Sequence, residues 1–523
     1  MGLIQKVGEF MTNIRSAYNA TFLTSAESAA YVWDSQSARL LRYQMGWSFF
    51  EGNQYEALQS FSQGMKTQKA LYKYVRNIYN PSAQLANFYT KTIWRGGLDI
   101  DTAEHGAIPI DFGYEGIDEQ ALAAAIITAW ANSNWNVNKN VHVLHGTTMG
   151  DTALYIRDDV EKQQSRIETL HPSLIKAAEL DNMGYVKSYV IEEQRRDANG
   201  NSSQYRETAE HGEGETIIFR TYRNGGLYAW EGNEDAQGTP RAEWEEPYGF
   251  IPLILTQHIN VGHDYGMSEA QPFWDKINEI NDQASLLNDQ VRKAVRPFKL
   301  ANFKKAASEI GFSTPTATTT NTMPGREIED IVYVDKDAAT ITPIVTPLDI
   351  AAVAANIEQM WEKLADDLPE IRKDIWSTDS GASGKSIMAA RGIVEGKVEE
   401  RRTNYDNGIV RALQMCIAIG GWRGYEGFDG YDLASYKAGK MDFSVKERPV
   451  FPKSEEQEDA EKAAFWATVG TAIQSSQGML TFEMIAKDFG WSDEKIAEYT
   501  QKRMPVVIDS APIDPITGMP MSL

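Results

Sequence analysis

The chain has 523 residues, of which 42% are hydrophobic and 11% aromatic, so it can bury several cores and is not disordered as a whole. Its formal net charge of -22 excludes a protein whose task is tight DNA binding, because that affinity comes from Lys and Arg on phosphates. The single cysteine, Cys416, excludes a disulfide within the chain and fits assembly in a reducing cytoplasm.

The first half, to about residue 265, mixes helix and strand. Residues 26–95 predict helices with a break at Pro81, and 121–130 predict an apolar helix. That apolar stretch is shorter than the roughly 20 residues that span a bilayer, and the N-terminus lacks the apolar core of a signal peptide. We therefore expect a soluble protein without membrane contact.

Strands are predicted next, at 151–159, 184–194 and 215–232. The NGG sequence at 224–226 lies between two runs of aromatic and β-branched residues, which predicts a hairpin turn. DANGNSS at 197–203 predicts a second turn.

Two long amphipathic helices are predicted in the middle of the chain. Apolar residues spaced by four and three form the first stripe, Phe273, Ile277, Ile280, Ala284, Leu287 and Val291, and this helix should end before Pro297. The second stripe is Ile350, Val353, Ile357, Met360, Leu364 and Leu368, followed by a break or kink at Pro369. Burial of six such side chains is worth roughly 9–18 kcal/mol, so each helix needs a partner, either the other helix or a neighbouring subunit.

The segments around the second helix complete the pattern. Residues 297–345 predict a small α/β insert with a β pattern at 326–335, and 377–386 form a loop of small residues. A very long helix is predicted from 387 to 419, interrupted by Gly392, Gly396 and Gly408, which permit bending. A strand-like stretch at 441–451 and C-terminal helices, one at 491–499, follow.

Several strings in this order resemble the portal proteins of tailed bacteriophages, the head–tail connectors. EEPYGFIPLILTQHINVGHDYGMSEAQPFWDKINEINDQAS (245–285) resembles the family's segment into the first stem helix, with Pro252, Gly266, Ser268 and Asn281 at matching positions. LPEIRKDIWSTDSGASGKSIMAA (368–390) resembles the passage into the tunnel loop, and GDTALYI (150–156) resembles a wing strand. Residues 451–460 and 478–503 resemble the return to the wing and the crown helices. The resemblance is co-linear over roughly 150–503.

The resemblance implies a mainly helical α+β portal fold that assembles as a ring around a central channel. The implied parts are a wing (1–265), a stem helix (266–296), a clip (297–345), a second stem helix (346–376), a tunnel loop (377–386), a long kinked helix with the return to the wing (387–452), and crown helices with the tail (453–523).

The resemblance also implies a function without catalysis or cofactor. About twelve copies would form a ring at one capsid vertex of the virion, after assembly in the host cytoplasm. Double-stranded DNA would pass through the ring during packaging and ejection. The implied protein partners are the terminase large subunit, the major capsid protein and scaffold, and a head-completion or adaptor protein.

Enzyme motifs were sought in the sequence. SGKS at 383–386 matches the end of a phosphate-binding P-loop, but the first glycine of that motif is replaced by Asp379, whose carboxylate would repel phosphate. His142 and His145 have no third ligand at metal-site spacing, which favours core histidines. A nucleotide-driven packaging motor is therefore the disfavoured alternative, and an oligomeric scaffold unrelated to DNA is a third.

Candidate contact residues follow from the implied channel. The tunnel loop is Ser377, Thr378, Asp379, Ser380, Gly381, Ala382, Ser383, Gly384 and Lys385, whose small side chains would form a low-affinity collar around DNA. Candidate DNA or partner contacts are Lys304 and Lys305 in the insert and, at the end of the first stem helix, Arg292, Lys293 and Arg296. The last three also complement the negative end of the helix dipole, which is reason enough for their presence.

Overall fold

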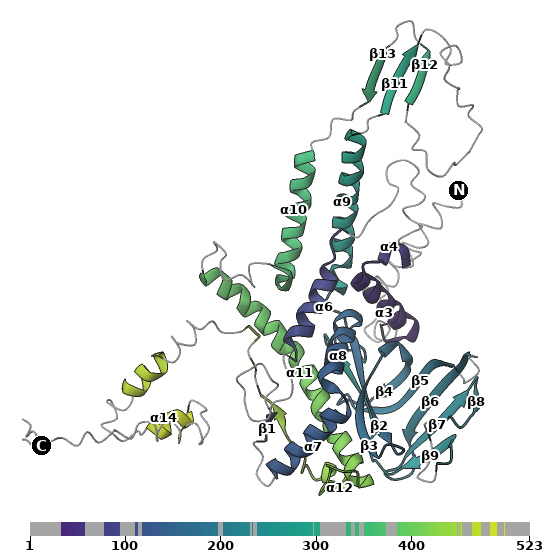
Figure 1. The fold of residues 1–523 in the computed structure, drawn as a ribbon, viewed down its shortest axis with the longest axis vertical. Coiled ribbons are helices and arrows are strands. Elements are labelled where there is room, and N and C mark those ends of the chain that lie inside the picture. The colour runs from purple at the N-terminus through teal and green to yellow at the C-terminus, as the bar shows by residue number, and fades with distance from the viewer. Residues whose placement is uncertain are drawn as a thin grey trace, which may run out of the picture. The chain divides into compact units, whose positions relative to one another are not determined.

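The computed structural model describes residues 33–57, 78–94, 110–112, 118–196, 202–230, 233, 238–295, 298–303, 331–335, 340–344, 350–372, 384–446, 448, 450–451, 463–471, 482–488 and 496. The chain divides into two compact units, Met1–Val450 and Phe451–Leu523. The first unit is α+β and contains helices and several β-sheets (Figure 1).

Five helices begin the first unit, and α3, α6 and α7 pack against α8. They are α3 (Gln36–Glu51), α4 (Gln54–Ala57), α6 (Pro81–Thr92), α7 (Glu119–Asn132) and α8 (Trp135–Met149). The side chain of Asn80 caps α6 by accepting a hydrogen bond from the backbone N–H of Ala83 at 3.1 Å, and Pro81 occupies the first turn, where no N–H is needed. The break expected at Pro81 is therefore the start of α6, and the apolar helix expected at 121–130 is confirmed as α7.

Two antiparallel sheets follow. One has the order β10-β2-β3, and the other has the order β4-β5-β6-β7-β8, with β9 also paired to β7. The strands are β2 (Asp151–Asp159), β3 (Gln164–Leu170), β4 (Ile175–Leu180), β5 (Val186–Arg196), β6 (Ser202–His211), β7 (Ile217–Arg223), β8 (Gly226–Leu227), β9 (Glu243–Glu246) and β10 (Leu253–Gln257). Asn224 and Gly225 have φ of 47° and 88°, the left-handed geometry of a tight hairpin, which confirms the predicted turn.

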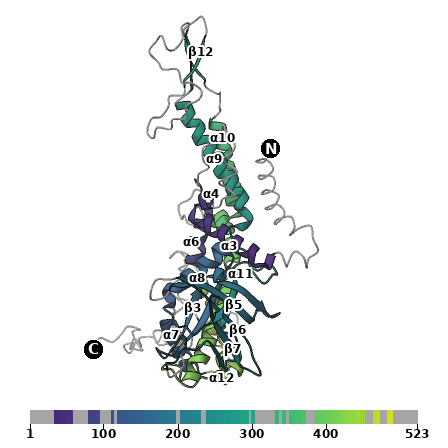
Figure 2. The ribbon, with the colours of Figure 1, turned by 90° about the vertical axis from the view of Figure 1, so that its right-hand side faces the viewer.

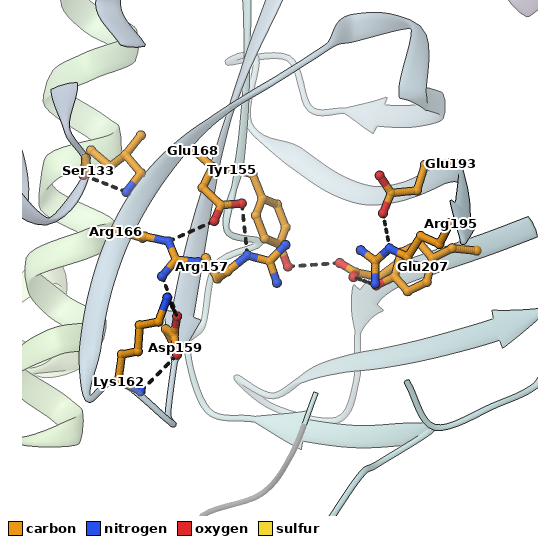
Figure 3. Close-up of polar contacts among 12 residues, drawn as sticks. Ser133, Tyr155, Arg157, Asp159, Lys162, Arg166, Glu168, Glu193, Arg195 and Glu207 are labelled. Atoms are coloured by element: carbon orange, nitrogen blue, oxygen red, sulfur yellow. Dashed lines mark hydrogen bonds and ion pairs between the residues drawn. The ribbon is translucent and has the colours of Figure 1, made fainter. Parts of the chain in front are cut away.

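A buried carboxylate joins the two sheets. Glu207 in β6 is 4% exposed and accepts a hydrogen bond from the hydroxyl of Tyr155 in β2 at 3.0 Å (Figure 3). It also accepts one from the hydroxyl of Tyr189 in β5 at 2.6 Å. Tyr205 also donates to Glu207. Three hydroxyl donors from three strands satisfy a carboxylate that would otherwise be costly to bury, so the cluster fixes the packing of one sheet against the other.

The outer edge of the larger sheet is covered by an arginine. Arg39 of α3 is 1% exposed, and its guanidinium donates to the carbonyls of Ile175 at 2.6 Å and Lys176 at 3.0 Å, at the start of β4. The same group lies 4.1 Å from the centroid of the Tyr265 ring. A helix side chain thereby uses carbonyls that an added strand would need.

Helices α9 (Trp274–Val295) and α10 (Ile350–Asp367) form a pair, and Figures 1 and 2 both draw them side by side. The sequence between them holds a three-stranded sheet in the order β12-β11-β13, made of β11 (Phe298–Phe303), β12 (Ile331–Asp335) and β13 (Thr340–Ile344). The sequence predicted only the strand that became β12. Helix α9 ends before Pro297, as expected, and Pro369 ends α10 by starting a 3-10 turn, Pro369–Ile371.

The first helix of the pair begins later than the predicted 266–296. Residues 266–270 lie outside helix, with Met267 bridged to Ile259, and a 3-10 turn at Gln271–Phe273 leads into α9 at Trp274. Gly266 explains part of this, because a Cβ there would lie 2.7 Å from the carbonyl oxygen of Gly150. The chain crosses another backbone too closely at that point to turn into a helix.

Helix α11 (Gly384–Arg423) is a single helix of 40 residues that passes through the body. It begins three residues before the predicted 387, so Gly384 and Lys385 belong to its first turn and not to the loop. A Cβ at Gly408 would lie 2.6 Å from Oγ1 of Thr256 in β10, whereas Gly392 and Gly396 have nothing within 4 Å. Gly408 therefore serves close helix–sheet packing, which the sequence interpretation had attributed to bending.

The remaining elements are short. Helix α12 is Leu433–Lys437, and the strand expected at 441–451 is reduced to β14 (Ser444–Val445), paired with β1 (Ile110–Asp111). In the second unit, residues 463–471 are helical and α14 is Phe482–Asp488, while the helix expected at 491–499 lies outside the described residues except for 496. Among the described helices none is both long and apolar enough to cross a bilayer.

Candidate functional site: the base of the helical pair

The helical pair is apolar inside and increasingly exposed away from the body. Near the body, Ile277 and Ile280 of α9 are each 1% exposed and Leu364 of α10 is 1% exposed. At the other end, Val291 is 37% and Ile350 is 40% exposed. A single chain therefore leaves the end of the apolar seam next to the β11–β13 sheet partly uncovered.

Asn281 fixes α9 to the body. Its side chain is buried, and its Oδ1 accepts hydrogen bonds from the backbone N–H groups of Ile78 at 2.9 Å and Tyr79 at 2.8 Å. Its Nδ2 donates to the carbonyl of Tyr79 at 3.0 Å. The Tyr79 ring in turn packs on Trp361 of α10, with 5.0 Å between centroids, so one short segment before α6 contacts both helices of the pair.

The segment that leads into α9 and the segment that follows α10 both contact helix α11 through buried carboxylates. We call these residues the base cluster: Tyr89, His258, Glu269, Glu370, Lys397, Arg401 and Tyr405. Glu269 precedes α9, and Glu370 follows α10. The cluster therefore joins the entry and the exit of the pair to one helix.

The two carboxylates bind successive turns of α11. The Nε atom of Arg401 lies 3.1 Å from Oε2 of Glu269, and the Nζ atom of Lys397 lies 3.0 Å from Oε1 of Glu370. Lys397 and Arg401 are four residues apart and so lie on one face of the helix. Tyr89 of α6 also donates to Glu370 Oε1 at 3.0 Å.

His258 completes the Glu269 side of the cluster. Its Nε2 lies 3.2 Å from Glu269 Oε2 and its Nδ1 lies 2.9 Å from the hydroxyl of Tyr405. Because burial lowers the pKa of His258, the ring is neutral near pH 7, with Nε2–H donating to Glu269 and Nδ1 accepting from Tyr405. Arg401 is therefore the ionic partner of Glu269.

The charge state of Glu269 follows from these contacts. Burial disfavours its carboxylate, but the hydrogen bond from His258 and the charge of Arg401 outweigh that effect and hold the pKa at about 2. Glu269 is 4% exposed and the Arg401 side chain 7%, so the pair is shielded from water. The cluster acts as a structural joint, because its two carboxylates are buried and are held by side chains of α11.

The residues predicted from the sequence lie elsewhere. Of the predicted tunnel loop, 377–383 fall outside the described residues, and only the backbone of Gly384 and Lys385 is described, in α11. Lys304, Lys305 and Arg296 also fall outside, and Arg292 and Lys293 are described only as backbone of α9. The tunnel loop and these contacts stay predictions.

A cavity of about 310 Å³ lies between the β2–β3 hairpin and strands β7 and β9. Its arginines lie beside carboxylates: Arg157 contacts Glu168 at 3.0 Å, and Arg166 contacts both Glu168 and Asp159 (Figure 3). A bound phosphate would have to compete with these internal partners, so the cavity does not resemble a nucleotide site. No group of three possible metal ligands comes together among the described residues.

His142 and His145 lie inside α8, as the core-histidine interpretation predicted. His142 is fully buried, with Nδ1 2.9 Å from the hydroxyl of Thr152, and His145 packs against the ring of His171 at 4.8 Å between centroids. Burial lowers the pKa of His142 to about 3 and that of His145 to about 4. Both rings are neutral components of the core.

The sequence interpretation missed the base cluster. The one signal available was the charged run at 397–402 in the predicted long helix, where lysine and arginine recur four residues apart. Their partners are 132 and 27 residues away, so spacing alone could not identify them.

Comparison with known proteins gives limited results. No family model matches the chain, and no curated protein matches it. Solved structures that are similar include chains of the virion of a native gene transfer agent particle and of the neck of that particle computed with C12 symmetry, each with 12% identity and a TM-score of 0.32 over 79% of this chain and 89% of the other. A chain of the neck of the empty particle, computed with C6 symmetry, has 12% identity and a TM-score of 0.35 over 79% of this chain and 90% of the other. Superposition at this level carries no weight in assigning fold or function.

Proposed function

We propose that this chain is a portal-type subunit. About twelve copies form a closed ring at one vertex of a capsid, and double-stranded DNA passes through the ring during packaging and ejection. The ring also serves as a docking platform for the terminase large subunit and for head-completion or tail proteins.

One observation supports this proposal most strongly. The co-linear sequence resemblance places a stem helix, an insert, a second stem helix and a long crossing helix in order, and α9, the β11–β13 sheet, α10 and α11 occur in that order. The base cluster binds the start of α9 and the end of α10 to α11. At the other end of the pair, Val291 and Ile350 are partly exposed, so neighbouring subunits can cover these apolar side chains.

The charge of helix α10 fits weak contact with DNA. The 18 residues of α10 include four acidic residues, Glu358, Glu362, Asp366 and Asp367, and one basic residue, Lys363. An acidic wall does not displace counterions from phosphates, so DNA can slide along it without being held. In this proposal the narrow collar is the tunnel loop, and ATP hydrolysis belongs to a separate motor protein.

The assembly is tested by native mass spectrometry and negative-stain imaging of the purified full chain. A closed ring of about twelve subunits with a central hole is the expected result. A stable dimer or hexamer that retains nucleotide would contradict the proposal and favour the motor alternative.

The channel role needs a separate test in packaging particles. Replacement of 377–385 by a short rigid linker should impair DNA packaging or retention while rings still form. Normal packaging and retention by this variant would refute the role of the loop.

A further inference from the structure

Helices α7 and α8 expose a surface without charge. Between Gln120 and Met149 the only Asp, Glu, Lys or Arg is Lys139, which is 6% exposed, although 24% of the whole chain is charged. The two histidines in this stretch are buried, and their lowered pKa values of about 3 and about 4 keep them neutral at physiological pH. The exposed side of both helices is therefore neutral.

The exposed side is also partly apolar. Val137 and Val141, one turn apart on α8, are 57% and 39% exposed, and Ile127 of α7 is 52% exposed. Asn136 and Asn140 border the two valines and are exposed as well. Apolar and amide side chains without charges are typical of the centre of a protein–protein contact and not of a surface that faces only water.

The helices that carry this surface are firmly held. On their other sides, Trp130 of α7 and Trp135 and Val143 of α8 are 6%, 1% and 0% exposed, and the rings of the two tryptophans meet at 6.1 Å between centroids. Trp130 also donates to Asn136 at 3.0 Å. The exposed valines and isoleucine are therefore presented on a rigid support.

From this surface we infer a contact with a second copy of this chain, here called the neutral face: Ile127, Asn136, Val137, Asn140 and Val141. The argument rests on charge. Each copy carries a formal charge of -22, and exposed acidic residues lie on other helices, as at Glu358 and Glu362 of α10 and Glu399 and Glu400 of α11. Two copies that met through such residues would repel each other, whereas the neutral face lets identical chains approach without that cost.

A basic partner would be attracted to the acidic residues instead, so a neutral face is best suited to another acidic chain. The inference deepens the proposed ring, on which it rests, by assigning one of the surfaces through which neighbouring subunits meet. A closed ring of more than two copies uses two different surfaces of each subunit, and the neutral face is one of them.

The single cysteine makes a direct test possible. Cys416 is fully buried and burial raises the pKa of its thiol to about 12, so the wild-type chain has no reactive thiol at neutral pH. Val141→Cys introduces one on the neutral face. Met183→Cys, at a position 78% exposed in the β4–β5 turn, is the matched control.

Maleimide labelling of the full-length chain is compared in the assembled and the dissociated state. We expect labelling of Val141→Cys to slow at least tenfold on assembly, and labelling of Met183→Cys to stay within twofold. Equal slowing of both variants, or of neither, would overturn the inference.

Charge variants at the same position give a second readout. Val141→Glu should shift the full-length chain toward monomers in mass photometry, whereas Val141→Thr, which is uncharged and of similar size, should assemble as the wild type does. Circular dichroism checks that both variants are folded.

The outcomes separate the two proposals. Wild-type assemblies formed by Val141→Glu refute the neutral face and leave the portal-type ring standing. A wild-type chain that never self-associates, even with the scaffold protein present, refutes both. A thiol of Val141→Cys that is protected in a monomer shows that the chain itself covers the face, which also refutes the inference.

Discussion

Removal of Arg401 from the base cluster should open the joint between α9 and α11. Arg401→Met keeps most of the side-chain volume but leaves the carboxylate of Glu269 buried without its ionic partner. Two charges 3.1 Å apart attract each other by about 5 kcal/mol at an effective dielectric constant of about 20. The net loss on removing one partner of a buried pair is about 3–5 kcal/mol.

The pKa of Glu269 reports the effect of the whole base cluster on its carboxylate. It falls from the ordinary 4.5 to about 2, which corresponds to roughly 3 kcal/mol of stabilisation of the charged form in the folded chain. The hydrogen bond from His258 and the charge of Arg401 both contribute to this stabilisation. Because the folded pKa is depressed, the stabilisation is complete above pH 4.5 and is lost as pH falls toward 2.

Native-state hydrogen exchange is the suitable assay, because it reports opening locally in a chain with more than one compact unit. Protected amides of α9 and α11 near the cluster should lose about 3–5 kcal/mol of opening free energy in Arg401→Met. The double variant Glu269→Gln/Arg401→Met should recover about 2–3 kcal/mol, since it leaves no unpaired charge. Lys276→Met, which removes an ion pair whose side chains are 56% and 42% exposed, should cost less than about 1 kcal/mol. A loss below about 1 kcal/mol in Arg401→Met would show that the pair does not hold the joint.

Three further predictions follow from buried groups. A shift from pH 7 to pH 5 should lower the thermal midpoint of unfolding. His142 and His145 have pKa values of about 3 and about 4 and stay neutral in the folded chain, whereas in the unfolded chain they bind protons below about pH 6.5. Each histidine should therefore lower the free energy of unfolding by about 2 kcal/mol at pH 5. Gly408→Ala should destabilise by about 1–3 kcal/mol in urea unfolding because its Cβ would lie 2.6 Å from a β10 hydroxyl, whereas Gly396→Ala, in open space, should stabilise by about 0.5–1 kcal/mol. Asn281→Ala should lower the urea midpoint by an amount equivalent to about 3 kcal/mol, because two backbone N–H groups lose their acceptor.

Each of these has a contrary outcome. A thermal midpoint independent of pH, or an unchanged pH slope in His142→Gln, would show that histidine protonation is not coupled to unfolding. Similar effects of the two glycine variants would contradict the close packing of α11 on β10. A midpoint of Asn281→Ala equal to that of the wild type would mean that water replaces the lost acceptor.

The sequence predicted those elements whose apolar periodicity is long and uninterrupted. Helices α9 and α10 were found because six apolar residues recur at helical spacing, and proline marks the end of each. Strand β2 was found with its observed bounds, because β-branched and aromatic residues end at turn residues. The turn at Asn224 was found because the residue types that tolerate positive φ are few.

What the sequence did not predict depends on partners far apart along the chain. Glu269 and Arg401 are each unremarkable in a charged stretch, and only the fold brings them within 3.1 Å. Strands β11 and β13 were not predicted, because each is short and lies beside proline and threonine residues. Their conformation depends on pairing with a neighbouring strand. Gly408 was taken for a bend because the strand against which it packs lies about 150 residues earlier.

The position of Arg39 has a consequence for aggregation of the protein at high concentration. In a concentrated solution of the protein, an uncovered strand edge on each copy would let sheets extend from one molecule into the next. With its guanidinium on the carbonyls of Ile175 and Lys176, the folded chain stops that extension at the start of β4. These two carbonyls already have donors within the chain, so they do not accept hydrogen bonds from a strand of a second molecule.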